Sequence, residues 1–128
     1  MDQLKTISIN VAVITVISLI LLAGNTQYRQ WSQYVKGEDA EKRGDVHQAI
    51  AGYEAAIHMY TPFSPLITSA AERLWLMADL AEKRGDQQEA LIICRALRSS
   101  FYSVKWLMQP GEEWINRCDK RIAVLVKQ

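Results

Sequence analysis

The sequence is poor in the residues that interrupt helices and in those that cross-link a chain. Its 128 residues include three prolines, six glycines and two cysteines. So few prolines and glycines exclude a long disordered linker. The cysteines, Cys94 and Cys118, are too few for a disulfide framework and too far apart for a metal-binding knuckle. We expect them to be two small buried hydrophobic residues or, in an oxidising compartment, a disulfide.

A surplus of charge is also missing, because 15 basic and 14 acidic residues leave a net charge of +1. A nucleic-acid binder would show a basic stripe, so we expect no nucleic-acid partner. The chain has no phosphate-binding glycine loop, nucleophile elbow or zincin motif. Neither His47 nor His58 has an acidic or thiol residue at metal-ligand spacing. The sequence therefore predicts no enzyme, no cofactor, no metal site and no small-molecule substrate.

One long hydrophobic run is present, since residues 6–28 are 23 consecutive uncharged residues. About 20 residues, each rising about 1.5 Å, cross a hydrocarbon core of roughly 30 Å. A cleaved signal peptide fits less well, because Leu21 stands where cleavage requires a small residue. A lipoprotein signal fails because Asn25 stands where the lipid-bearing cysteine would be. We therefore expect residues 1–28 to form a short tail and an uncleaved transmembrane helix.

Four polar residues, Ser8, Asn10, Thr15 and Ser18, lie within the core of this run, residues 7–23. Ser8, Thr15 and Ser18 fall near one helical face, and small hydroxyl residues often mark helix–helix contacts in lipid. The alternative is that these hydroxyls bond carbonyls of their own helix. A side-chain amide is costly in lipid, so we expect Asn10 to face another transmembrane helix or the headgroups. Asn10, Thr15 and Ser18 are the candidate transmembrane contacts. The short tail favours a cytoplasmic N-terminus, although the basic residues give almost no bias.

After this run the pattern is helical, and the hexapeptide Ala-Glu-Lys-Arg-Gly-Asp occurs twice, at Ala40–Asp45 and Ala81–Asp86. Its lysine and arginine suit the negative end of a helix, and its glycine suits the left-handed position that follows. Its aspartate suits the cap of the next helix. Each copy therefore predicts a helix end, a turn and a helix start. The predicted helices span residues 30–43, 45–60, 65–84, 86–100 and 111–127, approximately.

The two units resemble tetratricopeptide repeats. The family's order of small and large residues is matched by Gly37, Gly44, Ala49, Tyr53 and Ala56, and then by Ala78, Gly85, Ala90, Cys94 and Leu97. Cys94 and Leu97 depart from the family pattern. The units are 41 residues apart, against a family period of about 34, and the excess lies in residues 61–67.

The expected fold is all-α: a transmembrane helix, then a domain over residues 29–128. This domain would contain two tetratricopeptide-like hairpins, over about 30–60 and 65–100, and a capping helix over about 111–127. The capping helix carries an apolar stripe made of Trp114, Ile115, Cys118, Ile122 and Leu125. We expect this stripe to pack on the helix before it.

The resemblance implies that the first helix of each repeat lines a concave face. This register places there Trp31, Tyr34, Glu38, Glu41, Lys42, Glu72, Trp75, Asp79, Glu82 and Lys83. An aromatic floor with charges of both signs is a candidate groove for a peptide or helix. The alternative for Trp31 and Trp75 is that they belong to the core.

A second candidate surface is the segment Ser99–Trp114, which joins two predicted helices. It carries Phe101, Tyr102, Trp106, Leu107, Met108 and Trp114. Aromatic residues and methionine are common anchors in protein interfaces. Two alternatives are that these residues close a small core, or that Trp106 and Lys105 rest at lipid headgroups.

The overall plan resembles bacterial inner-membrane tetratricopeptide proteins, some of which assist secretion or envelope assembly. Others accompany proton-driven complexes of the ExbB–ExbD and TolQ–TolR type. The resemblance implies a single-pass inner-membrane scaffold or accessory subunit with a periplasmic helical domain. Its partners would be the lipid bilayer and subunits of a membrane protein complex. The alternative is a periplasmic chaperone-like module that binds extended or unfolded clients.

Overall fold

The structure, a computed structural model, describes residues 1–59, 64–105 and 107–127. These residues contain helices and turns but no strand. The five helices are α1 (Asp2–Lys42), α2 (Val46–His58), α3 (Pro65–Lys83), α4 (Gln87–Ser103) and α5 (Glu112–Lys127). The predicted all-α fold, with a long apolar N-terminal helix followed by helical hairpins, is confirmed. The predicted end of the second helix at residue 60 lies outside the described residues.

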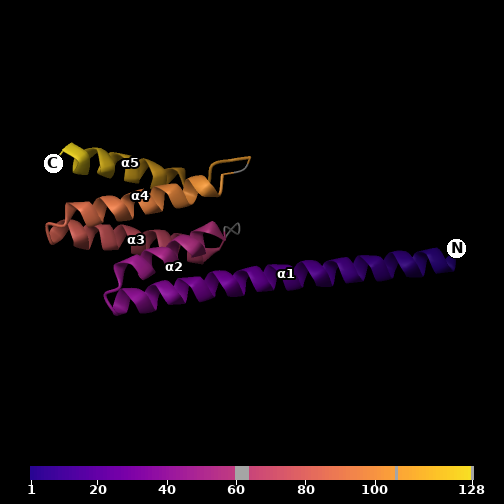
Figure 1. The fold of residues 1–128 in the computed structure, drawn as a ribbon. Helices are drawn as coiled ribbons and strands as arrows, with labels where there is room; N and C mark the ends of the chain where they lie inside the picture. Colours follow the sequence, from indigo (N-terminus) through magenta and orange to yellow (C-terminus); the bar gives the residue numbers. More distant parts are fainter. Residues whose placement is uncertain (60–63, 106, 128) are drawn as a thin grey trace.

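The helices α2 to α5 lie side by side with alternating directions (Figure 1). The helix α2, and to a smaller extent α3, packs against the C-terminal part of α1. The N-terminal part of α1 extends alone beyond this bundle. We call the end of the bundle from which it extends the proximal end; there α2 and α4 finish and α3 and α5 begin. The opposite, distal end holds the two short turns that join α1 to α2 and α3 to α4.

One helix, α1, replaces the predicted transmembrane helix and the predicted first repeat helix. The predicted repeat helix begins near Gln30, whereas α1 runs without a break from Asp2 to Lys42. Residues 24–30, where the two predicted segments meet, contain no proline, and nothing lies within 4 Å of a Cβ atom added to Gly24. This stretch therefore does not stop a helix. A formed helix also extends more easily than a new one nucleates. The apolar run and the domain are therefore parts of one element.

The two hexapeptide copies form the same turn, as predicted. Gly44 and Gly85 adopt φ angles of 78° and 81°, which glycine tolerates without strain. The Asp45 carboxylate accepts a hydrogen bond from the Gln48 amide at 3.2 Å, and Asp86 accepts one from Glu89 at 3.0 Å. Both aspartates are thus helix N-caps. The duplicated hexapeptide sets the geometry of the two distal turns.

The first hairpin is built on a very close contact between α1 and α2. A Cβ atom added to Gly52 would lie 2.6 Å from the Gly37 Cα atom, so position 52 has no room for a side chain. A Cβ atom added to Gly37 would lie 3.0 Å from the Tyr53 ring, a tight contact. The Tyr53 ring covers Gly37 and is fully buried, together with Ala49 and Ala56. The sequence analysis named four of these residues and missed Gly52.

The second hairpin and α5 complete the core. The predicted residues Ala78, Ala90 and Leu97 are fully buried. The apolar stripe of α5 packs on α4 as predicted, with Ile115, Cys118 and Leu125 buried and Trp114 and Ile122 partly buried. Cys94 and Cys118 are buried free thiols. Burial raises the pKa of the Cys94 thiol to about 11 and that of Cys118 to about 12.

Candidate functional site

The N-terminal part of α1 presents its apolar side chains to the surroundings. Residues 1–26 are all exposed, so no other described element covers them. Within the described residues, α1 is the helix long and apolar enough to cross a membrane. Its large aliphatic side chains are each at least half exposed: Ile7, Ile9, Val11, Val13, Ile14, Val16, Ile17, Leu19, Ile20, Leu21 and Leu22. Lipid is the surrounding in which such a surface is stable.

The candidate transmembrane contacts Asn10, Thr15 and Ser18 all lie on this exposed part of α1. The Thr15 hydroxyl donates to the Val11 carbonyl of the same helix at 2.8 Å. For Thr15, the structure thus has the bond that the alternative interpretation requires. The role of these residues in helix–helix contact stays a prediction.

Where the exposed part of α1 meets the bundle, two aromatic residues flank one buried amide. Tyr28 and Trp31 are 67% and 52% exposed, with ring centroids 6.4 Å apart. Such a pair is typical of the boundary between membrane and water. Gln30 lies between them in the sequence. Its side chain is fully buried and donates to the carbonyls of Ala56 and Met59, both at 3.0 Å. Gln30 therefore ties α1 to the C-terminal end of α2.

The α1 side of the predicted groove is half-buried against α2 and α3. The Tyr34 ring packs 5.5 Å from the Tyr53 ring, and burial and the nearby Glu38 carboxylate raise the pKa of Tyr34. Glu41 forms an ion pair with Arg73 of α3. Of the other predicted residues, Lys42, Glu72 and Lys83 are exposed.

On the α3 side of the predicted groove, Trp75, Asp79 and Glu82 contact side chains of α5. The Trp75 ring packs on Trp114, with centroids 6.2 Å apart, and the Arg121 guanidinium lies 4.6 Å from the Trp75 centroid. Arg121 also pairs with Asp79, and with Glu82 at 2.7 Å. These charges and this tryptophan are therefore engaged within the chain, a long-range contact that sequence reasoning missed.

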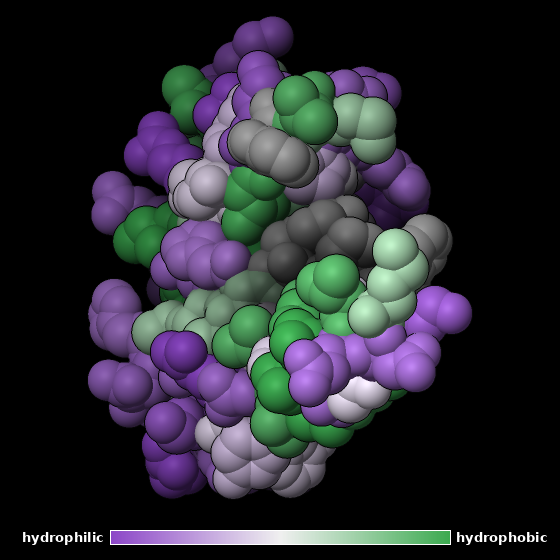
Figure 2. All heavy atoms as spheres, turned by 90° about the vertical axis from the view of Figure 1, so that its right-hand side faces the viewer, coloured by the Kyte–Doolittle hydropathy of each residue, from purple (hydrophilic) through white to green (hydrophobic). Residues whose placement is uncertain are grey.

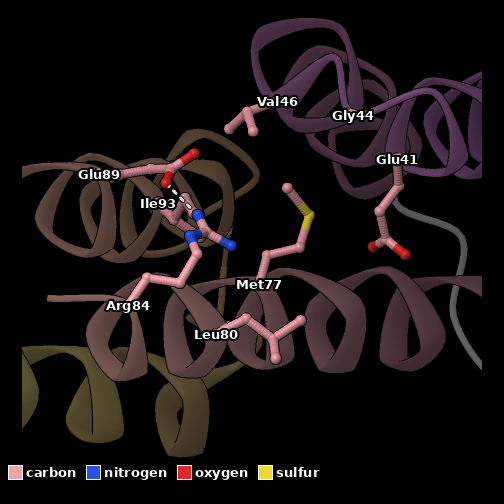
Figure 3. Close-up of a pocket in the computed structure, with 8 residues that line it drawn as sticks. All are labelled: Glu41, Gly44, Val46, Met77, Leu80, Arg84, Glu89 and Ile93. Carbon is pink, nitrogen blue, oxygen red and sulfur yellow. Dashed lines mark hydrogen bonds and ion pairs between the residues drawn. The ribbon is translucent and has the colours of Figure 1, made fainter. Parts of the chain in front are cut away.

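An open surface remains beside these contacts with α5, at the distal end of α3. Leu76 and Leu80 are 49% and 56% exposed, one helical turn apart. Leu80 borders a cavity of about 380 Å³ between the two hairpins. Figure 3 shows its lining, in which both hexapeptide copies take part: Glu41, Gly44, Val46, Met77, Leu80, Arg84, Glu89 and Ile93.

This cavity combines apolar and charged walls. The Met77 and Leu80 side chains form one side of the cavity, and the ion pair between Arg84 and Glu89 forms another (Figure 3). We call Leu76, Leu80 and this cavity the distal surface. Sequence reasoning passed over it because the repeat register pointed to Trp75 and Asp79, on a different face of α3. The spacing of Leu76 and Leu80 was the signal that could have found it.

The second candidate segment divides into core and surface residues. Phe101 is buried at 2% exposure, and Trp114 is partly buried against Trp75. Tyr102 is 43% exposed and lies beneath the Arg98 guanidinium, 4.7 Å from its ring centroid. Leu107 and Met108 are each 81% exposed. Trp106 lies outside the described residues.

In comparisons with known proteins, no protein-family model, no curated protein and no solved structure matches this chain. Among the described residues, no group of three or more His, Cys, Asp or Glu side chains is placed to hold a metal ion. A functional argument therefore rests on the exposed part of α1, the distal surface and the residues after α4.

Proposed function

We propose that this protein is a single-pass membrane-anchored scaffold or accessory subunit, and that its tetratricopeptide-like domain binds other proteins beside the bilayer. One observation carries the proposal: the exposed apolar part of α1 and the first helix of the domain are a single helix. An anchor of this kind confines the domain to a thin layer next to the membrane. Confinement raises its effective concentration near membrane partners, so that binding by the domain alone can be weak.

The distal surface is the proposed binding surface for a partner segment. Leu76, Leu80 and Met77 supply apolar contacts, and the Arg84–Glu89 pair supplies charges of both signs at the edge. A short peptide or helix with one or two apolar side chains suits a cavity of about 380 Å³ with such walls.

The finer proposal is an inner-membrane protein with a periplasmic domain that accompanies a proton-driven complex of the ExbB–ExbD or TolQ–TolR type. The polar residues Asn10, Thr15 and Ser18 within the apolar run support a neighbour inside the bilayer. The resemblance to inner-membrane tetratricopeptide proteins supports the compartment.

The test is to purify the tagged full chain in mild detergent and to identify the proteins that elute with it. We expect membrane subunits to co-elute, and we expect Leu80→Glu to remove those bound at the distal surface. Val126→Glu is the matched control, because Val126 is 61% exposed on α5, outside that surface. Recovery of the full chain as a monomer without membrane partners would contradict the proposal.

The second candidate function is a chaperone-like module that holds extended clients. The exposed Leu76 and Leu80 favour it to the extent that an open apolar surface suits unfolded chains. The two functions differ in their need for the anchor. Removing residues 1–28 should leave client binding intact if the protein is a chaperone, and should abolish partner recovery if it is an anchored subunit.

A further inference from the structure

Two apolar side chains that follow α4 are each exposed to a larger fraction than the aliphatic side chains of the long apolar run. Leu107 and Met108 are each 81% exposed, whereas the aliphatic side chains from Ile7 to Leu22 are 50–68% exposed. We call residues 104–105 and 107–110 the proximal loop. Exposing two large apolar side chains to water in a short connection is unfavourable, so we expect this pair to contact something other than water.

The proximal loop is held to the core at both of its ends. The amides of Val104 and Lys105 donate to the carbonyls of Phe101 and Tyr102, at 3.3 and 3.2 Å. At the other end, the Gln109 side chain donates to the Phe101 carbonyl at 2.8 Å. Phe101 itself is buried, so the loop is fixed to the core while Leu107 and Met108 lie outside it.

The proximal loop lies at the end of the bundle from which α1 extends. Figure 1 shows it projecting beyond the ends of α2 and α4 in the direction of the N-terminal part of α1. Figure 2 looks onto this side of the molecule, with the N-terminal part of α1 directed toward the viewer, and shows hydrophobic side chains gathered below the centre of the view. The exposed tyrosine and tryptophan of α1, Tyr28 and Trp31, flank in sequence Gln30, whose side chain bonds the C-terminal end of α2.

The bundle is also fixed in direction relative to α1. The buried Gln30 side chain bonds two carbonyls at the C-terminal end of α2 and accepts from the Ser64 hydroxyl at 2.6 Å. Because α1 has no break between Tyr28 and Gln30, a bilayer around the apolar run faces the proximal end of the bundle.

We propose that the proximal loop is a second membrane contact, in which Leu107 and Met108 insert among the lipid headgroups of the leaflet that α1 leaves. This inference rests on the proposed function in one respect, namely that α1 crosses the bilayer. Two contacts, the helix and the loop, fix the rotation of the domain about the α1 axis. They thereby determine the direction in which the distal surface faces its partners.

The contact is apolar rather than electrostatic. Lys105 is the cation of the loop, but Glu112 and Glu113 begin α5 directly after it, and all three are exposed. These charges leave no excess of positive charge to attract anionic lipid. The loop is therefore expected to insert equally into zwitterionic and into partly anionic vesicles.

The test uses the full chain reconstituted in phosphatidylcholine vesicles, with an environment-sensitive fluorophore on one introduced cysteine. Three variants are compared: Leu107→Cys in the loop, Leu21→Cys in the apolar run and Gln88→Cys at the distal end. Nitroxide-bearing lipids should quench the label at 107 several-fold more than the label at 88. Quenching at 21 but not at 107 would overturn the loop contact and leave the membrane anchor standing. The same result is expected if a protein, rather than lipid, covers the loop. Absence of quenching at 21 would instead overturn the membrane anchor.

A second measurement removes the contribution of the fluorophore to insertion. The label is moved to Ser103→Cys, which is exposed at the end of α4, and Leu107→Asp and Met108→Asp are introduced together. We expect quenching at 103 to fall at least several-fold in this variant. Unchanged quenching at 103 would contradict the role of Leu107 and Met108.

Discussion

The two parts of α1 have the same secondary structure in opposite surroundings. Residues 1–26 are exposed on every side, whereas the later part buries Gln30, Gly37 and Ala40 against other helices. Bulky aliphatic residues surround the first part, which is long and apolar enough to cross a membrane and has no neighbour among the other described elements. Small residues on one stripe of the second part let α2 approach to near backbone contact. The side chains on the faces of a helix, rather than its length, therefore decide what packs against it.

Because α1 is one continuous helix, the orientation of the domain relative to the apolar run is fixed. A flexible linker would let the domain turn freely relative to the anchor. One uninterrupted helix, with the Gln30 side chain bonded to the end of α2, sets which end of the bundle lies toward the apolar run. Four experiments would break or sharpen the comparison between the two parts.

The largest effect is expected for a bulky residue at the α1–α2 crossing. In Gly37→Leu the new Cβ atom would lie 3.0 Å from the Tyr53 ring and 3.2 Å from the Tyr53 amide nitrogen. We expect a loss of folding free energy on the order of 3 kcal/mol, because overpacking displaces a buried ring and backbone. The measurement is urea unfolding of the domain in detergent, followed by circular dichroism. Gly24→Leu is the matched control on the same helix, since nothing lies within 4 Å of its Cβ position. Equal destabilisation by both variants would contradict the difference between the two parts.

A charge in the first part should act on membrane integration instead. For Ile14→Arg we expect a cost of about 3 kcal/mol for insertion, with the fold of the domain unchanged. The fraction of full chain that resists alkaline extraction from membranes measures this cost. Ile14→Leu is the control and should stay in the membrane. If the arginine variant is retained as well as the control, the apolar run is not the anchor.

An intermediate effect is expected where the two parts meet. Gln30→Leu keeps the approximate volume but removes both hydrogen bonds to the α2 carbonyls. Leaving these carbonyls without the buried donor should cost about 1–3 kcal/mol. Thermal unfolding in detergent measures the loss, and the exposed Gln3→Leu serves as the control. A variant as stable as the parent chain would show that Gln30 does not tie α1 to α2.

The last effect, a dependence on alkaline pH, belongs to the domain alone and is absent at neutral pH. Burial raises the pKa of the Cys94 and Cys118 thiols from 9.0 to about 11 and about 12. Below pH 9 both thiols are neutral in the folded and unfolded chain, so their titration does not lower the free energy of unfolding. Above pH 9 the unfolded chain loses these protons first, so stability falls by about 1 kcal/mol per pH unit and thiol, up to the folded pKa.

Urea unfolding between pH 8 and pH 10.5 checks this dependence. The double variant Cys94→Ala and Cys118→Ala should show a weaker loss of stability over the same range. Identical slopes would rule out the buried thiols as its source. The apolar run, residues 6–28, has no carboxylate, lysine, arginine or cysteine and should stay in the membrane throughout.

A structural feature could be predicted from the sequence where a few neighbouring residues cause it. The turns after Arg43 and Arg84 were predicted because each needs only a glycine and a capping aspartate. The apolar run was recognised from its length. The continuity of α1 was missed because residues 24–30 carry neither a clear stop nor a clear start signal.

The missed parts of the candidate site have long-range causes. Arg121 lies about 40 residues from Asp79 and Glu82 in sequence, yet it binds both carboxylates. No local sequence pattern indicates this contact. The repeat register therefore placed Trp75 and Asp79 on an open face, whereas in the structure both contact α5. Gly52 was missed for the same reason, since its partner Gly37 belongs to a different helix.

The account depends most on α1 carrying the chain from the bilayer into the domain as one rigid helix. The most direct measurement is a spin-label distance between Leu21→Cys and Lys36→Cys in the full chain, reconstituted in nanodiscs. Both positions are exposed, and they are 15 residues apart. A continuous helix at about 1.5 Å per residue predicts one narrow distribution centred at about 22 Å. A broad distribution, or a second maximum, would show a break between anchor and domain and would contradict the account.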